Sequence, residues 1–197
     1  MALSTIGPSG LNDTIVSGKT ELAAIPATTD ELLISDAGTI KRIDAQFFQN
    51  TPAFSARMSS AQTISNETFT KADFDTEIFD TDGAYDHSTN QRFTVPTGKG
   101  GKYFFYAQAI CDAGSAAQLQ NCQITFYKNG SQFKKNTWNF NSNDIYYAGM
   151  QVSAVLDLSA SDYIEVYVRN SDASGSPVID GSGSTSTEFS GYKIIGA

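Results

Sequence analysis

The stretch from Phe54 to Phe105 constrains the fold more than any other part of the chain. Aromatic side chains recur along it at short intervals, separated by turns rich in Asp and Gly. Phe and Tyr favour strands, whereas clusters of Asp, Gly, Asn and Pro end them. We therefore expect short, tightly connected strands that pack as a sandwich rather than as helices, and we expect this stretch to build the main domain.

The pattern of strands continues toward the C-terminus. Residues 151–158 alternate apolar with polar or smaller side chains, which is typical of a half-buried strand. The Asn-rich segment around Trp138 is open to two interpretations, a strand or an exposed loop. Asp172–Thr187 is rich in Gly and Ser, so we expect a long connection there. Further strands are expected at 123–127, 163–169 and 189–195.

Five segments carry a resemblance to a known family. In chain order they read PAFSAR, FTKADFDTEIFDTDGAYD, RFTVP, GKYFFYAQA and STEFSGYKI. Together they resemble the globular C1q domain of the C1q and tumour-necrosis-factor superfamily, over roughly residues 52–195. The resemblance implies an all-β fold, a jelly-roll sandwich that assembles as a homotrimer. The positions that carry it are Ala53–Ala56, Phe74 with Asp75, Tyr85 with Asp86, Phe93–Pro96 and Phe189–Tyr192.

The segment Gly101–Ala109 suggests where subunits of such a trimer would meet. Its four consecutive aromatic residues place apolar side chains on both faces of one strand. One face can fill the core, and the other needs a cover, which in a trimer is the adjacent subunit. We predict that Tyr103, Phe105 and Tyr192 lie in the trimer interface.

Residues 1–50 differ in composition from residues 51–197, so we expect two parts with a boundary there. Met1–Pro26 has no sustained apolar period and cannot bury enough of itself to fold alone, so we expect sister subunits or a docking partner to order it. Residues 29–44 are predicted to form a hairpin that turns at Gly38, followed by a one-turn helix capped by Asp44. The apolar residues of the hairpin, expected to attach it to neighbours, are Leu32, Ile34, Ile40 and Ile43.

This hairpin is similar to a small N-terminal module of fibre-like and virion-associated proteins of tailed bacteriophages. The resemblance implies a non-enzymatic structural protein on the virion surface. Because the chain has no long shaft of repeats, we expect a homotrimer that decorates or cements the capsid by contacting the major capsid protein. The alternative is a short tail-fibre or receptor-binding protein, mounted on tail proteins. A third class, a cellular C1q-like binding protein made for secretion, stays open, although no signal peptide begins this sequence.

A fibre would need a surface that recognises the host. The loops that we expect to serve this purpose offer exposed aromatic, amide and acidic groups suited to a host-surface glycan or protein. They span residues 80–86, 138–146 and 172–179, and the candidate residues are Asp82, Trp138 and Tyr146.

Chemistry beyond binding has little support in the sequence. Asp80, Asp82 and Asp86 supply oxygen ligands of the kind that calcium prefers, but the full twelve-residue calcium loop is missing. The alternative is a turn in which these side chains bond their own backbone. The single histidine, His87, gives no support to a catalytic triad. We expect no catalytic residue, no enzymatic activity and no cofactor.

Cys111 and Cys122 leave two alternatives open. Their separation fits no common zinc spacing, so we expect buried or half-buried free thiols. A cross-strand disulfide would form instead if the two residues faced each other at close range.

The charge and hydropathy of the chain exclude two classes of partner. A net charge of −8 repels nucleic acid phosphates, and no basic run offsets it. No stretch approaches the apolar length of a membrane span, so we expect no membrane insertion.

Overall fold

The computed structural model describes Thr20, residues 22–24, 26–27, 29–114, 117–140, 142–173, 176–181 and 187–195. The chain divides into two units, Met1–Phe48 and Gln49–Ala197. This division falls close to the boundary expected after residue 50. Most of the arm Met1–Pro26 lies outside the described residues, so its ordering by neighbours stays a prediction.

The first unit contains the predicted hairpin. Strands β1 (Glu31–Asp36) and β2 (Thr39–Asp44) pair antiparallel, and the one-turn 3-10 helix η1 (Ala45–Phe48) follows. Ala37 and Gly38 form the turn with φ of 48° and 81°. Two successive positive φ values match the twist of a two-residue hairpin, which explains the glycine. The predicted hairpin and short helix are both confirmed.

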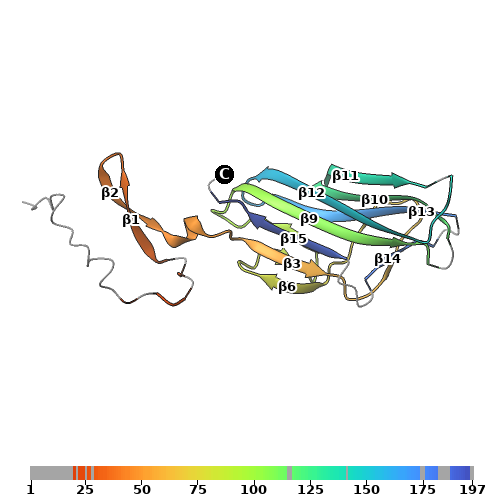
Figure 1. Cartoon of the computed structure of the whole chain (residues 1–197), viewed down its shortest axis with the longest axis horizontal. Helices are drawn as coiled ribbons and strands as arrows, with labels where there is room; N and C mark the ends of the chain where they lie inside the picture. Colours follow the sequence, from red (N-terminus) through yellow and green to blue (C-terminus); the bar gives the residue numbers. More distant parts are fainter. Residues whose placement is uncertain are drawn as a thin grey trace, which may run out of the picture. The chain divides into compact units, whose positions relative to one another are not determined.

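The second unit is a sandwich of two antiparallel sheets (Figure 1). The first sheet has the order β4-β14-β9-β15-β3-β6, with β12 on the other edge of β9. Its strands are β3 (Ala53–Arg57), β4 (Gln62–Thr63), β6 (Thr76–Asp80), β9 (Gly101–Asp112), β12 (Tyr147–Leu158), β14 (Val178–Asp180) and β15 (Glu188–Lys193).

The second sheet has the order β11-β10-β13-β8-β7, and β5 pairs with β13. Its strands are β5 (Thr70–Lys71), β7 (Tyr85–Asp86), β8 (Arg92–Thr94), β10 (Leu119–Lys128), β11 (Ser131–Asn139) and β13 (Tyr163–Asp172). The Asn-rich segment around Trp138 is therefore a strand. Among the described residues no α-helix occurs, and no helix is long and apolar enough to cross a membrane.

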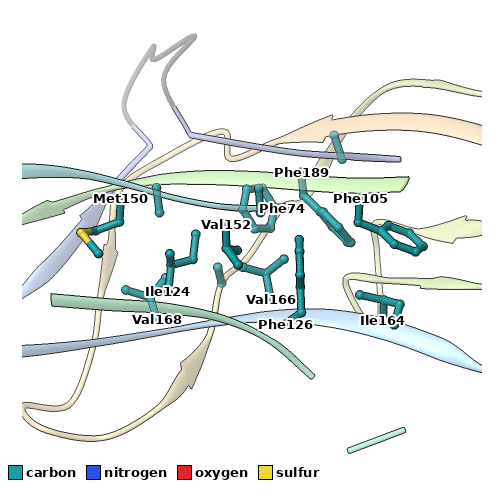
Figure 2. Packing of buried hydrophobic residues seen from close by; sticks show 14 of the residues in the cluster. Phe74, Phe105, Ile124, Phe126, Met150, Val152, Ile164, Val166, Val168 and Phe189 are labelled. Atoms are coloured by element: carbon teal, nitrogen blue, oxygen red, sulfur yellow. The ribbon is translucent and has the colours of Figure 1, made fainter. Parts of the chain in front are cut away.

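The core fills the space between the two sheets. Alternate side chains of β9 and β12 point into it, as the two-residue period of a strand requires. Phe74, Phe105, Phe126 and Phe189 meet there, with ring centroids 5.8–6.2 Å apart (Figure 2). Because Phe105 and Phe126 come from different sheets, this aromatic cluster holds the two layers together. The predicted jelly-roll sandwich is confirmed.

Candidate functional site

The outer face of the first sheet carries a row of apolar side chains that the core does not use. Val155 of β12 pairs with Phe104 of β9, which pairs in turn with Tyr192 of β15. The rings of Phe104 and Tyr192 lie 5.5 Å apart. Val155 remains 57% exposed and Tyr192 42% exposed. This row therefore presents apolar surface to solvent in the single chain.

Two exposed aromatic residues extend this row in both directions. Phe79 of β6 pairs with Ser55, whose neighbour across the sheet is Ser190 of the same outer face. On the other side, Phe133 of β11 lines a hollow of about 390 Å³ together with Phe104 and Val155. We call the resulting surface the apolar face. It consists of Phe79, Phe104, Phe133, Val155 and Tyr192.

Two of the three predicted interface residues do not lie on this surface. Tyr103 and Phe105 are 0% exposed and pack inside the sandwich, where the Tyr103 hydroxyl donates a hydrogen bond to the carbonyl of Lys99. They are in the core because strand side chains alternate, so Phe104 takes the outward position between them. The prediction that Tyr103 and Phe105 lie in the interface is therefore wrong, because both side chains point into the core. Tyr192 lies on the outer face and stays a candidate.

The predicted attachment residues of the hairpin divide between its two faces. Leu32 pairs with Ile43, and Ile34 lies on the same face two residues farther along β1. Ile40 lies on the opposite face with Leu33, and these two side chains are 71% and 80% exposed. The structure therefore brings together three of the four predicted residues and places Ile40 with Leu33 on the second face, which also carries the ion pair of Arg42 and Glu31.

The predicted receptor-loop residues lie at opposite ends of the sandwich. Asp82 lies where β9 begins, with its carboxylate 3.5 Å from Nζ of Lys99. Tyr146 lies where β9 ends, because its carbonyl accepts a hydrogen bond from the amide of Ala113. Trp138 lies near the end of β11 on the Tyr146 side. These three residues cannot contribute to one binding site within a single chain.

The three candidate calcium ligands belong to two successive turns, Asp80 and Asp82 to the first and Asp86 to the second. Asp80 accepts hydrogen bonds from the amides of Asp82 and Tyr85. Asp86 accepts from the amide of Thr89 and the side chain of Asn90, and these bonds lower its pKa to about 2. Among the described residues no group of three or more His, Cys, Asp or Glu could hold a metal ion. The carboxylates of Asp80 and Asp86 thus act as turn-forming groups, as the alternative interpretation predicted. The carboxylate of Asp82 instead accepts a hydrogen bond from the hydroxyl of Thr81.

The two cysteines lie inside the sandwich. Cys111 of β9 and Cys122 of β10 are both fully buried and free. A hydrogen bond with the Cys122 thiol, together with burial, raises the pKa of the Cys111 thiol. The interpretation as buried free thiols is confirmed.

Two antiparallel sheets with this strand order and an aromatic core define a jelly-roll sandwich of the C1q and tumour-necrosis-factor class. The C1q domain family matches residues 53–194, so the chain belongs to that family. Domains of this class are typically trimeric and non-enzymatic.

Two solved structures are similar to part of this chain. The Eiger TNF of S. frugiperda is 12% identical, with a TM-score of 0.50, covering 74% of this chain and 93% of that chain. The globular domain of the zebrafish complement 1qA protein is 18% identical, with a TM-score of 0.45, covering 73% of this chain and 98% of that chain. No curated protein matches the chain.

Proposed function

We propose that this protein is a non-enzymatic homotrimer that forms a structural part of a tailed-bacteriophage virion surface. The sandwich is the outward head, and the N-terminal unit attaches it to the particle. The observation that carries this proposal is the amount of apolar surface that each unit leaves uncovered in the single chain. The phage context is supported by the resemblance of the hairpin to an N-terminal module of phage virion proteins.

The apolar face is the proposed contact between heads. Large exposed apolar patches on soluble proteins mark interaction sites. Fully burying a side chain such as Val155 or Phe104 contributes about 1.5–3 kcal/mol. In a threefold arrangement each subunit buries its apolar face against a neighbour, so the same contact occurs three times. The trimer is thereby stabilised by apolar burial.

The hairpin is the proposed attachment element. A two-stranded hairpin is at best marginally stable alone in water. Its first apolar face, Leu32, Ile34 and Ile43, would pack against sister hairpins, which leaves Leu33 and Ile40 for the particle. Three linked hairpins would bind three equivalent sites on the particle, so that avidity strengthens a weak single contact.

A double substitution tests the attachment. Leu33→Asp with Ile40→Asp places charge on the proposed particle-facing side and should abolish incorporation into virions. Ala160→Asp, in an exposed turn of the sandwich, should be incorporated normally. Loss of incorporation of the double variant supports the assignment if that variant still forms a trimer in solution, and its normal incorporation would contradict the assignment.

The proposed position on the virion is the capsid, with the major capsid protein as the partner. A decoration protein that clamps neighbouring capsid subunits stabilises the shell, because it binds the assembled form only. The second candidate is a short tail fibre that binds the host surface. The observation that favours it is the exposed aromatic surface of Trp138 and Tyr147 at one end of the sandwich.

The copy number of the protein in purified virions separates these positions. Quantitative mass spectrometry against the major capsid protein should give hundreds of copies for a capsid decoration. A handful of copies in multiples of three would identify a tail fibre. The absence of the polypeptide from washed virions would contradict both, and would favour a cellular C1q-like binding protein.

A further inference from the structure

The described residues of the loop between β11 and β12, residue 140 and residues 142–146, are held in place by backbone hydrogen bonds. The amide of Phe140 donates to the carbonyl of Gln120 over 2.7 Å, and Ile145 and Leu119 exchange two hydrogen bonds of 3.2 and 2.9 Å. The carbonyl of Tyr146 accepts from the amide of Ala113. These bonds tie the loop to β10 and to the end of β9. Phe140 and Ile145 are therefore positioned before any ligand arrives, which lowers the entropy cost of binding.

Residues of this loop line an open hollow of about 310 Å³ that is partly apolar and partly polar. Phe140 and Ile145 form the apolar part, because both pack partly against the core. Asn139, Ser142 and Asn143 supply the polar part.

An exposed aromatic side chain adjoins this hollow. The ring of Trp138 meets the ring of Phe140 edge to face, with centroids 6.0 Å apart. Trp138 nevertheless remains 48% exposed. An exposed aromatic ring in contact with Phe140 of this hollow suits a ligand with both apolar and hydroxyl surfaces.

We propose that this hollow binds a neutral sugar residue. The C–H faces of a sugar ring can pack on the aromatic surfaces, while each Asn amide offers two donors and an acceptor to the ring hydroxyls. Ligand pockets usually measure about 300–1,000 Å³, so this hollow suits one small ring rather than a flat protein surface.

The charge around the hollow determines which sugars fit. Asp144 lies in the chain between the lining residues Asn143 and Ile145, and its carboxylate accepts a hydrogen bond of 3.4 Å from the side chain of Gln120. The whole chain carries a net charge of −8. Acidic sugars would be repelled by both, so the site selects neutral ones. This role goes beyond the structural one, since a capsid decoration and a tail fibre could each carry it.

Binding is tested on the purified full chain, so the result does not depend on where the protein lies in a virion. Saturation-transfer NMR would be recorded with glucose, galactose, mannose and N-acetylglucosamine, and with sialic acid as the anionic comparison. We expect at least one neutral sugar to receive saturation and sialic acid to receive none. No transfer to any neutral sugar at millimolar concentration, or binding of sialic acid alone, would overturn the proposal.

Three substitutions localise the site. Asn143→Ala and Trp138→Ala should each weaken sugar binding about tenfold, the equivalent of one good contact. The loop should survive the first change, because Asn143 bonds Phe140 through its main-chain amide. Phe47→Ala removes an exposed aromatic ring from the other unit and should leave binding unchanged. The proposal would also be overturned if Asn143→Ala and Trp138→Ala both bound sugar as strongly as the wild type and unfolded at the same temperature.

Discussion

At the scale of single residues, Gly191 shows why one motif position must be small. A Cβ atom at this position of β15 would lie 2.6 Å from Cδ1 of the Phe105 ring. Phe105 is fully buried in the aromatic core and cannot move aside without disturbing Phe54 and Phe189. Glycine is therefore required by packing, and no turn is involved.

Replacing this glycine should destabilise the head. We expect Gly191→Ala to lower the free energy of unfolding by about 1–3 kcal/mol, because an added methyl group overpacks the core. Gly149→Ala in β12 is the matched control, since the nearest atom, Cδ1 of Ile110, would lie 3.8 Å away. Thermal unfolding of both variants checks this. Equal melting temperatures for the two would show that the close approach to Phe105 carries no cost.

For single residues, the sequence predicted the strand correctly where a family motif marked it. It failed where the pairing register decides which side chains of a strand face the core. The Phe189–Tyr192 motif correctly indicated a core strand. The four aromatic residues from Tyr103 to Tyr106 gave no such guide, because either alternate pair could have faced inward. The register of β9 is set by its pairing with β12 and β15. These strands are distant in sequence, so no local pattern reveals the pairing.

At the scale of elements, Asp162 joins two turns that are distant in sequence. Its carboxylate accepts hydrogen bonds from the Asn129 side chain (2.7 Å) and from the amide of Ser159 (2.9 Å), and lies 3.0 Å from Nζ of Lys128. These bonds, led by that of Asn129, lower the pKa of Asp162 to about 2. The turn after β10 is thus linked to the turn after β12.

The contribution of this carboxylate should depend on pH in a known direction. Because the folded pKa of Asp162 lies below its ordinary value of 3.8, its stabilisation is present above that pH and is lost as the pH falls toward 2. At neutral pH we expect Asp162→Ala to cost about 1 kcal/mol, since the site is near solvent. Urea unfolding at pH 7 and pH 2.5 checks this. A stability difference from the wild type that grows on acidification would contradict the assignment.

Element-level prediction was most successful for long or strongly patterned segments. The hairpin was predictable because Asp36, Ala37 and Gly38 separate two apolar runs. Short strands such as β4, β5 and β14 were not, because each exists only through pairing with a strand distant in sequence. For the same reason the sequence could not show that the loop after β11 is tied to β9 and β10.

At the scale of the whole molecule, assembly should depend on the apolar face. Val155→Asp places a charge in the middle of the proposed interface and should shift the protein from trimer to monomer. The head should still fold, because Val155 is more than half exposed in the single chain. Ala160→Asp, in an exposed turn outside the apolar face, should remain trimeric. Sedimentation velocity of both variants checks this, and a trimeric Val155→Asp would exclude the apolar face as the contact.

The most direct test of the central claim is the mass of the full chain in solution, by light scattering after size-exclusion chromatography. The proposed assembly predicts a single species with three times the chain mass of 21.2 kDa at micromolar concentration. A stable species at the mass of one chain would contradict it, because the apolar surfaces of both units would then remain exposed to water.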